Sequence, residues 1–407
     1  MNILWLIPAA LLAFASVCLG YLYVLALASV RLRHTILLPQ PRHRFAIAIP
    51  AHNEEAVIGG TIARLQTLDY APDLYDIHVV SDNSEDRTSE IVRASGVTCW
   101  ERVDETRRGK GYALAWLFER LLAHERRYDA MIVFDADSQV DPAFLRVMDG
   151  EMHAGHRVIQ GHHVIANPTD NWFTAVMTIA FIMDNRLRNV GRSNLGFSSK
   201  LMGDGMCFDR HILEQCPWAT TSLSEDAECQ AQLLLRDVRV RFAADAITSG
   251  EIPASLAVAR HQRARWMQGR ADVSSQLASQ VLKAGVRNLN LAQLDGAVEL
   301  LLPSFSTLFV LTTVCILSWV GLRIAWPDTP FHRGWLSVLY AAVIAYPVLG
   351  LVLSGAPARL YLYLFYAPLY ALWRTGLRLL VRLRRGPTTW VRTPRKSEGV
   401  VDAQFNH

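Results

Sequence analysis

Residues 130–137, Ala-Met-Ile-Val-Phe-Asp-Ala-Asp, give the clearest indication of the fold of this chain. Five apolar residues in a row predict a buried strand, and two carboxylates follow at its end, one residue apart. Because successive strand residues point to opposite faces, Asp135 and Asp137 can serve one divalent cation only if the chain turns at Ala136. The stretch therefore predicts a strand, a turn and a metal site. For this motif alone, an exposed turn after a strand is the alternative.

The succession of strand, polar loop and helix also occurs twice before this stretch. Residues 45–50 are an apolar run followed by Ala-His-Asn-Glu-Glu and a helical pattern, and residues 75–81 are a second run that leads into Asp82. Alternating strands and helices indicate an α/β fold with a largely parallel sheet and helices on both faces. Ligands of such sheets bind at the carboxyl ends of the strands, where Asn53, Asp82 and Asp135 all fall.

A basic, glycine-flanked loop precedes the next helical run. It reads Arg-Arg-Gly-Lys-Gly-Tyr over residues 107–112, and the helical pattern covers residues 113–122. The Lys110 side chain and free backbone amides at a helix start suit an anionic ligand such as a diphosphate. The spacing is not that of a P-loop, which excludes a nucleoside triphosphatase of that class. An ordinary basic loop is the alternative.

The composition indicates membrane segments. The chain has 407 residues, of which 51% are hydrophobic, and its mean hydropathy is +0.16. Residues 1–30 carry no charged side chain and are long enough to span a bilayer core, and Arg31 and Arg33 follow them. A cleaved signal peptide is the alternative, but no Lys or Arg precedes the run, which also exceeds the ~7–15 residues of a signal core. We therefore expect residues 1–33 to be an uncleaved anchor whose basic flank lies in the cytoplasm.

Two further uncharged runs, residues 300–322 and 335–353, are long enough to cross a membrane. Residues 360–373 are an uncharged run that is shorter than ~20 residues and contains a proline. Arginines then recur at three- or four-residue spacing, as on an interfacial amphipathic helix. We predict three spans, a surface helix and a cytoplasmic basic tail at residues 384–396, with four spans as the alternative.

The charge, the cysteines and the histidines narrow the range of binding partners and metal sites to be expected. The net charge is +4 and the isoelectric point is near 8.8, but the basic residues crowd beside apolar runs, which suits membrane lipid rather than nucleic acid. The six cysteines form no Cys-x-x-Cys pair and predict reduced, mostly packed thiols. His162 and His163 have no Glu or Cys at ligand spacing, so we expect packed or surface histidines.

Five motifs occur in the order and rough spacing of family-2 glycosyltransferases, which the chain resembles over roughly residues 43–270. They are Pro50-Ala51-His52-Asn53-Glu54, Asp82 in Ser-Asp-Asn-Ser-Glu-Asp, Asp135-Ala136-Asp137, Ser224-Glu225-Asp226 and Gln262-Arg263-Ala264-Arg265-Trp266. The last two are the most discriminating, and they look like those of the membrane-embedded branch with cellulose, chitin, hyaluronan and poly-N-acetylglucosamine synthases. Ser81 and Ser224 depart from the family pattern, which has an aspartate pair and Thr-Glu-Asp at these places.

The resemblance implies a GT-A fold and a set of roles. Asp226 is the catalytic base, and Asp135 and Asp137 hold Mg²⁺ or Mn²⁺. The nucleotide-diphospho-sugar donor, a UDP-sugar in the first instance, is assigned to Pro50, His52, Asn53, Glu54, Asp82, Lys110, Asp135, Gln262, Arg265 and Trp266. The acceptor side is assigned to Gly203, Asp204, Trp218 and Glu225, with core packing as the alternative for Trp218.

The chemistry of sugar transfer agrees with these roles. An acceptor hydroxyl attacks the anomeric carbon, so one carboxylate takes its proton while a cation or basic group stabilises the departing diphosphate. On a helix, Gln262, Arg265 and Trp266 share one face, which offers a guanidinium to a diphosphate and an indole to a sugar ring. A membrane-surface helix is the alternative for this segment, and both roles are compatible.

The expected organisation has five parts: a transmembrane anchor (1–33), a cytoplasmic GT-A domain (34–255), interfacial helices (256–296), two transmembrane helices (297–355), and an amphipathic helix with a basic tail (356–407). We expect an inverting, metal-dependent glycosyltransferase, integral to the plasma or inner membrane, that acts on a polysaccharide or lipid acceptor. A ceramide-type lipid glucosyltransferase and a non-catalytic nucleotide-sugar-binding scaffold are the alternatives. A nucleotidyltransferase is disfavoured, because it has no evident use for membrane spans or Gln-x-x-Arg-Trp.

Overall fold

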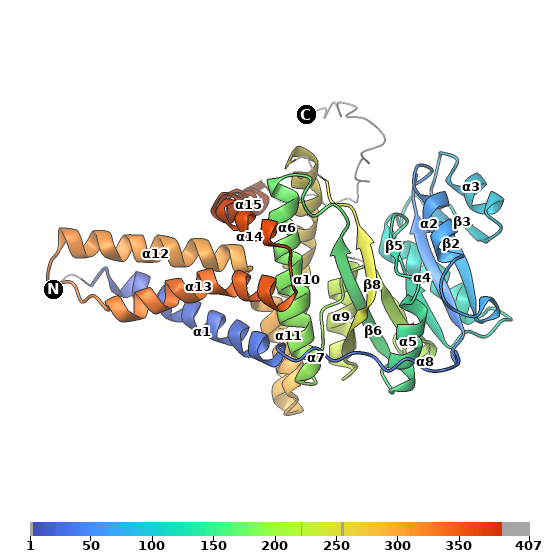
Figure 1. Ribbon diagram of the computed structural model, residues 1–407, viewed down its shortest axis with the longest axis horizontal. Helices are drawn as coiled ribbons and strands as arrows, with labels where there is room; N and C mark the ends of the chain where they lie inside the picture. Colours follow the sequence, from blue (N-terminus) through green and yellow to red (C-terminus); the bar gives the residue numbers. More distant parts are fainter. Residues whose placement is uncertain (1–2, 221, 254–255, 385–407) are drawn as a thin grey trace. The chain divides into compact units, whose positions relative to one another are not determined.

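The computed structural model describes residues 3–220, 222–253 and 256–384, which form two compact units (Figure 1). The helical unit comprises Met1–Arg31, Pro168–Leu195 and Leu301–Arg385, and the sheet unit comprises Leu32–Asn167 and Gly196–Leu300. The predicted basic tail at residues 384–396 lies outside the described residues, apart from the main chain of Arg384.

An eight-stranded sheet forms the centre of the sheet unit, in the order β3-β2-β1-β4-β7-β6-β8-β5. Strands β3, β2, β1 and β4 run parallel, whereas β7 is antiparallel to both of its neighbours. The expected α/β fold with a mostly parallel sheet is therefore confirmed. The strands are β1 (Phe45–Ala51), β2 (Tyr75–Asp82), β3 (Thr98–Arg102), β4 (Ala130–Val133), β5 (Gln139–Val140), β6 (Val158–Ile165), β7 (Met206–Asp209) and β8 (Val240–Gly250).

Alternation along β1 explains how the sheet joins two cores. Ile47 and Ile49 pack into one hydrophobic cluster with α2, α3 and α5, while Ala46 and Ala48 pack into another with α4, α8 and α9. Strands covered on both faces read as continuous apolar runs, which is why β1 and β4 could be predicted. These helices are α2 (Ile58–Leu65), α3 (Thr88–Ala94), α4 (Lys110–Leu122), α5 (Phe144–His153), α8 (Arg210–Gln215) and α9 (Glu225–Leu235).

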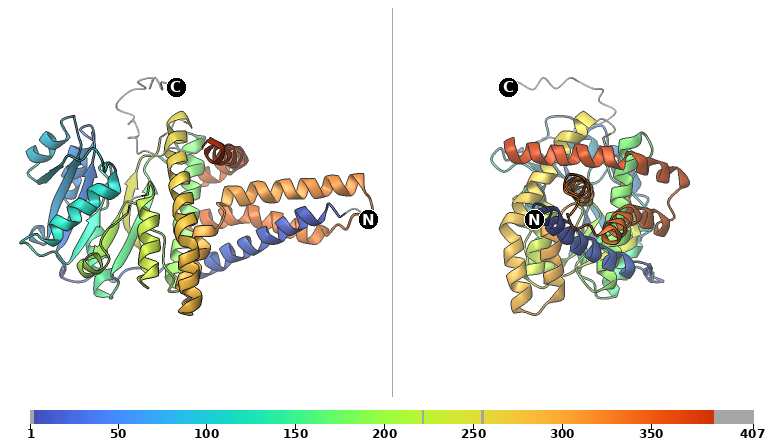
Figure 2. Two further views of the ribbon diagram at one scale, coloured as in Figure 1. Left: turned by 180° about the vertical axis from the view of Figure 1, so that it is seen from behind. Right: turned by 90° about the vertical axis from the view of Figure 1, so that its left-hand side faces the viewer.

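The register of the parallel strands brings their carboxyl ends to one edge of the sheet. Ala51 of β1 is level with Ser81 of β2, and Ala48 is level with Val133 of β4. The loops that follow these three strands therefore start close together, as the sequence predicts. The sheet unit also contains the single helical turn η1 (Pro72–Leu74) and the helix α11 (Leu291–Leu301). Its longest helix is α10 (Leu256–Arg287), drawn in yellow to orange in Figure 2.

The helical unit contains three helices that are long and apolar enough to cross a membrane, as predicted: α1 (Leu6–Ala28), α12 (Phe305–Ala325) and α13 (Arg333–Leu353). Their facing side chains form one cluster in which Leu12 and Trp319 are fully buried. The second span begins at Phe305 rather than at residue 300, because α11 ends at Leu301 and Pro303 cannot continue a helix. All six cysteines are free.

Residues 168–195, which connect β6 to β7, belong to the helical unit. This differs from the expected uninterrupted domain at residues 34–255. The segment forms α6 (Trp172–Ile182), the π-helical turn η2 (Met183–Asn189) and α7 (Val190–Asn194). Gly191 touches α1 so closely that a Cβ atom there would lie 2.2 Å from the main-chain oxygen of Leu25, which only glycine permits.

Arg186 of this segment caps α1 and α13 at once. Its guanidinium donates hydrogen bonds to the main-chain oxygens of Ser29 and Val30 after α1, and of Leu353 at the end of α13. The carboxyl ends of α1 and α13 therefore lie together, so the two helices run in the same direction. That arrangement is the one expected when a single span, α12, separates them.

The chain after α13 forms α14 (Ala358–Leu362), η3 (Tyr363–Tyr366) and α15 (Ala367–Arg384). The short uncharged run at residues 360–373 is thus broken into three pieces. Large apolar side chains at three- and four-residue spacing are exposed along these pieces: Leu362, Phe365, Leu369, Leu372, Leu379 and Leu383. This stripe is of the kind that an interfacial helix buries in a bilayer, which remains a prediction.

Candidate functional site

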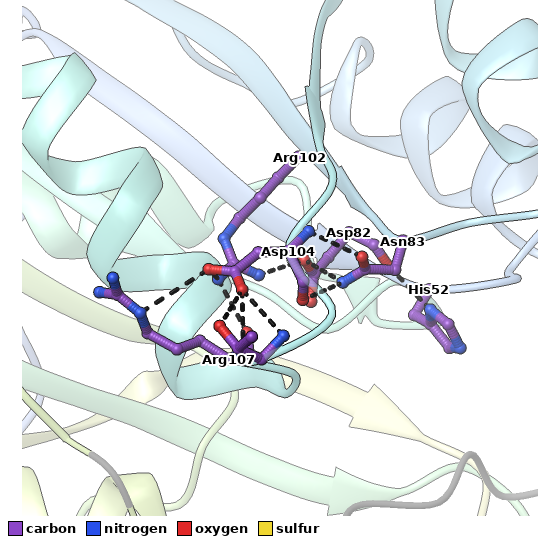
Figure 3. A network of polar contacts seen from close by, with 7 residues as sticks. His52, Asp82, Asn83, Arg102, Asp104 and Arg107 are labelled. Atoms are coloured by element: carbon purple, nitrogen blue, oxygen red, sulfur yellow. Dashed lines mark hydrogen bonds and ion pairs between the residues drawn. The ribbon is translucent and has the colours of Figure 1, made fainter.

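The loops after β1 and β2 are joined by hydrogen bonds (Figure 3). His52 Nδ1 lies 2.7 Å from the main-chain oxygen of Asp82, and Asn53 Oδ1 accepts from the main-chain N–H of Glu85 at 2.8 Å. The main-chain N–H of Glu54 donates to Thr88 Oγ1 at 2.8 Å. The Pro50–Glu54 loop, predicted to bind the donor, is therefore fixed to the loop that carries Asp82.

Asp82 forms a buried ion pair that the sequence did not reveal. Arg102, the last residue of β3, places Nη1 2.5 Å from Asp82 Oδ1 and Nη2 2.9 Å from Asp104 Oδ2. Burial raises the pKa of Asp82, and the Arg102 guanidinium only partly opposes this effect. Arg107 lies beside Asp104 in the same network, as Figure 3 shows. A basic residue at the end of a parallel strand was the available sequence signal.

Lys110 joins three segments at the start of α4. Its Nζ atom lies 2.5 Å from Asp135 Oδ1, 2.6 Å from the main-chain oxygen of Gly203 and 3.6 Å from Glu225 Oε1. Burial alone lowers the pKa of Lys110, but the charges of Asp135 and Glu225 outweigh it and raise the pKa above its ordinary value. Lys110 is therefore a firmly held cation next to the predicted metal-binding turn.

The chain turns at Ala136 and Asp137, as predicted from the spacing of the two carboxylates. The Ser138 N–H donates to the main-chain oxygen of Asp135 at 3.1 Å and closes the turn. The Asp135 side chain is 44% exposed, so its carboxylate is open to a ligand. Among the described residues no group of three His, Cys, Asp or Glu side chains could hold a metal ion. Two carboxylates on a turn fit a hard cation that takes its other ligands from phosphate and water.

A buried group lies behind this turn. Asp204 Oδ1 accepts from Ser138 Oγ at 2.6 Å and from the Asp135 N–H at 3.1 Å, while its Oδ2 lies 2.8 Å from His163 Nδ1. Burial alone raises the pKa of Asp204, but these donors and Thr248 lower it to about 2. Burial lowers the pKa of His163, and Asp204 outweighs that effect and raises it.

The location of Asp204 bears on its predicted acceptor role. The residue is 2% exposed and its carboxylate points to His163 and the turn, which favours a supporting function over contact with an acceptor. Trp218 is similarly buried and packs edge-on against Phe118 and Phe208, with ring centroids 5.7 and 5.5 Å apart. Trp218 therefore has the surroundings of a core residue, which is the alternative to its predicted acceptor-side role.

Glu225 and Asp226 occupy the first turn of α9, where a helix N-terminus favours negative charge. Asp226 Oδ2 lies 3.9 Å from the position that a Cβ atom on Gly203 would take, and the Lys110 ammonium lies 3.5 Å from the same point. Burial raises the pKa of Glu225, and Lys110 opposes this rise. Asp226, Lys110 and Gly203 are thus neighbours, as the predicted roles require.

The Gln262-to-Trp266 motif lies on α10, so its three key residues share a helix face as predicted. Burial lowers the pKa of Arg265, and the charges of Glu225 and Asp135 act against that effect, which places the guanidinium within their electrostatic reach. The Arg263 guanidinium lies 4.6 Å from the centre of the Trp266 ring. Gln262 is half-buried.

The site thus has two connected parts at one edge of the sheet. One contains His52, Asp82 and Arg102, and the other is built around Lys110 and Asp135. The main chain of Gly109 acts to lower the pKa of the Asp82 carboxyl, so the residue before Lys110 lies beside Asp82 and links the two parts. The first part has the polar and planar groups that recognise a nucleoside, and the second has cations and carboxylates for a diphosphate, a metal ion and a reacting hydroxyl.

Comparison with known proteins gives a family match over the region that carries this site. The family model described as "Glycosyltransferase like family 2" matches residues 41–269. A probable glycosyltransferase of Bacillus subtilis, YdaM, is 28% identical over 256 residues, which are 59% of this chain and 58% of that protein. The beta-monoglucosyldiacylglycerol synthase of Synechocystis is 28% identical over 233 residues, or 56% and 48% of the two chains.

Two more distant similarities are also to glycosyltransferases. Glucomannan 4-beta-mannosyltransferase 7 of Arabidopsis thaliana is 23% identical over 249 residues, which are 58% of this chain and 44% of that protein. The matches span about half the length of these curated relatives. The solved mannosyltransferase of Pyrobaculum calidifontis, in complex with GDP-Man and Mn²⁺, superposes with a TM-score of 0.55 at 16% identity, over 86% of this chain and 97% of that one. This likeness confirms the GT-A fold.

Proposed function

Because this chain belongs to the glycosyltransferase-like family 2, we propose that it transfers a sugar, with inversion, from a nucleotide-diphospho-sugar to a lipid or polysaccharide acceptor at a membrane. The observation that carries the proposal is the meeting of Lys110, Asp135 and Asp226 at one edge of the sheet. A cation, an open metal-binding carboxylate and a second carboxylate are the groups that direct sugar transfer needs.

The donor lies along this edge. His52 and the network around Asp82 bind the nucleoside, and Lys110 and Arg265 bind the diphosphate, whose negative charge grows as the sugar departs. Asp135 and Asp137 would hold a Mg²⁺ or Mn²⁺ ion, which when bound neutralises charge on the diphosphate. The Pyrobaculum mannosyltransferase was solved with GDP-Man and Mn²⁺, which supports this division of the site.

Asp226 is the base. It begins a helix beside Gly203, whose lack of a side chain leaves room next to the carboxylate. An acceptor hydroxyl that reaches this place loses its proton to Asp226 as its oxygen attacks the anomeric carbon from the face opposite the diphosphate. Lys110, between Asp135 and Glu225, stabilises the leaving group on the other side.

A lipid fits the helical unit better than a growing polymer. Leu12 of α1, Trp319 of α12 and Tyr346 of α13 pack into one cluster and are at most 1% exposed. Three helices that fill the space between them with side chains offer no channel of their own for a polysaccharide. The beta-monoglucosyldiacylglycerol synthase of Synechocystis supports a lipid acceptor, while the glucomannan 4-beta-mannosyltransferase of Arabidopsis supports a polymer.

We propose that the sheet unit lies at the cytoplasmic face of the plasma or inner membrane. Arg31 and Arg33 follow α1 directly, and basic residues mark the cytoplasmic end of a span. The carboxyl ends of α1 and α13 meet at Arg186, so both fall on this side. Nucleotide-sugars are available in that compartment.

One experiment tests the proposal directly. The detergent-purified full chain is incubated with UDP-glucose, UDP-galactose, UDP-N-acetylglucosamine or GDP-mannose, with Mg²⁺ or Mn²⁺ and mixed membrane lipids. Release of nucleoside diphosphate and transfer of labelled sugar into extracted lipid are measured. A single labelled lipid supports the lipid acceptor, and a ladder of products supports a polymer. Absence of turnover with every donor, or turnover unchanged in Asp226→Asn, would contradict the proposal.

A further inference from the structure

Asp204 lies in a turn that is shaped by two glycines. Gly203 has φ of 85° and Gly205 has φ of 65°, which is the left-handed region that other residues rarely adopt. A Cβ atom on Gly205 would lie 3.1 Å from Thr248 Cγ2, so the turn also packs closely on β8. This backbone buries the Asp204 side chain against the turn after β4, although Gly203 itself borders Lys110 and Asp226.

The buried carboxylate joins three separate segments. Its Oδ1 accepts from the Asp135 N–H and the Ser138 hydroxyl, which are the two ends of the turn after β4. Its Oδ2 faces His163 on β6 at 2.8 Å, and the Thr248 hydroxyl of β8 lies 3.1 Å from the same His163 nitrogen. The main-chain oxygen of Asp204 accepts from Gln160 Nε2 at 2.8 Å, which fixes the residue itself.

We propose that Asp204, held in place by His163, is a positioning residue that fixes the Asp135–Ser138 turn so that its carboxylates face the cation of the donor. This inference rests on the proposed function. Two hydrogen bonds reach the turn from behind, and Lys110 holds the Asp135 side chain from the front. The turn is thus held from both sides while the Asp135 carboxylate stays open, and Asp204 itself touches neither donor nor acceptor.

The arrangement explains why an acid is needed at this position. A carboxylate accepts from several donors at once, while Asn offers one acceptor oxygen and two N–H groups. In Asp204→Asn one acceptor oxygen becomes an N–H donor, so either the turn or His163 loses a hydrogen bond to residue 204. The Asp135 N–H keeps Ser138 Oγ as a partner and His163 keeps Thr248 Oγ1, so the loss is that of about one hydrogen bond. Groups that support metal ligands in this way typically change metal affinity by about 10- to 100-fold when removed.

Four substitutions separate positioning from other roles. Asp204→Asn removes the carboxylate that accepts several hydrogen bonds. His163→Leu removes the imidazole that orients the Asp204 carboxylate. His163→Asn is the conservative control, because its amide nitrogen can take the place of Nδ1 while the rest of the imidazole is lost. Ser138→Ala removes the hydroxyl that donates to Asp204 and accepts from the Asp135 N–H, without altering the buried charge, and it serves if Asp204→Asn does not fold.

The first readout is hydrogen exchange of the full chain in detergent. In Asp204→Asn and His163→Leu, the amides of residues 135–138 exchange about tenfold faster, as expected for one lost hydrogen bond. His163→Asn restores the wild-type rate, and peptides from α4 and α9 are unchanged. The inference is overturned if exchange of residues 135–138 does not respond to Asp204→Asn.

The second readout is the affinity for Mn²⁺ alone, measured by electron paramagnetic resonance of the free ion. Dissociation constants rise about 10- to 100-fold in Asp204→Asn and His163→Leu and stay near the wild-type value in His163→Asn. Faster exchange with unchanged Mn²⁺ affinity assigns Asp204 a structural role only and overturns the inference. If both readouts respond but the wild type transfers no sugar from any donor, the proposed function fails and the positioning of the turn stands.

Discussion

Lys110 Nζ lies 2.5 Å from Asp135 Oδ1, so the first residue of α4 holds the carboxylate that follows β4. The ammonium is also 2.6 Å from the Gly203 oxygen, so it links the turn after β4 to the Gly203 loop. In the proposed function one side chain therefore both orients Asp135 and brings positive charge to the leaving diphosphate. Its replacement removes both tasks together.

Lys110→Met should lower kcat by about 10²- to 10³-fold, the range found when a single preorganised electrostatic group is removed. Donor KM should rise as well, because the cation also contacts the diphosphate before reaction. The matched control is Arg108→Met, which removes an exposed cation from the same loop and should leave both constants near wild type. Equal losses in the two variants would show that only the general charge of the loop matters.

Asp226→Asn should lower transfer by about 10²- to 10⁴-fold, because the acceptor hydroxyl loses its base. Donor binding should be spared, since the proposed nucleoside and diphosphate contacts are with Asp82, Lys110 and the turn after β4. The measurement combines turnover with equilibrium binding of the nucleoside diphosphate. A variant that keeps near-normal turnover would remove Asp226 from the catalytic role and leave Glu225 as the candidate.

Arg102→Leu should destabilise the sheet unit by about 3–5 kcal/mol, since it leaves the buried Asp82 carboxylate without its partner. The double variant Asp82→Asn/Arg102→Leu should recover much of this loss, because no buried charge then remains unpaired. Chemical denaturation of the three proteins checks the order of stabilities. If the double variant is as unstable as the single one, the guanidinium matters through packing rather than through Asp82.

Buried His78 gives the sheet unit a pH-dependent stability. Trp100 Nε1 donates to His78 Nδ1 at 3.2 Å, so Nε2 carries the proton toward the Tyr128 hydroxyl, 2.9 Å away. Burial lowers the pKa of His78 to about 4, with Asp76 opposing and His124 and Arg126 adding to the effect.

The sign of this pH dependence follows from proton uptake. Between pH 6.5 and 4 the unfolded chain binds a proton at His78 and the folded chain does not, so stability falls as pH falls through this range, by up to about 3 kcal/mol. Above pH 6.5 His78 is neutral in both the folded and the unfolded chain, so it takes nothing from the stability there. Denaturation midpoints at pH 7.5, 6 and 5 should show the fall in the wild type and a smaller one in His78→Leu. An identical slope in both would assign the dependence to other groups.

Local sequence patterns predicted those parts of the fold that depend on neighbours along the chain. The strand before Asp135 is a continuous apolar run because helices cover both of its faces, and the turn at Ala136 follows from two carboxylates with one function. The sequence also predicted the helix that begins at Glu225 and the three apolar spans. Each of these features depends on residues that lie within some twenty positions of one another in the sequence.

The remaining features depend on residues far apart in sequence. His163 has no metal-ligand spacing and reads as a packed histidine, but the crossing of β6 next to β7 brings it to Asp204. Arg102 reads as one basic residue among many until β3 pairs with β2. Residues 168–195 follow a strand of the sheet unit, yet Gly191 packs against α1 and Arg186 bonds to the ends of α1 and α13. Such contacts arise only once the topology is set.

Arg186→Leu should destabilise the helical unit, because three main-chain oxygens at the ends of α1 and α13 lose a charged donor. Hydrogen bonds to charged groups contribute about 1.5–3 kcal/mol each, and water can replace part of this at a membrane surface, so a loss of about 3 kcal/mol is expected. Arg333→Leu, at an exposed position at the start of α13, is the matched control and should have little effect. Thermal denaturation in detergent, followed separately by a thiol probe at buried Cys18 of α1 and by nucleotide binding to the sheet unit, distinguishes the units. Earlier exposure of Cys18 with nucleotide binding retained is the expected result, whereas simultaneous loss of both would mean that Arg186 stabilises the whole chain rather than the helix ends.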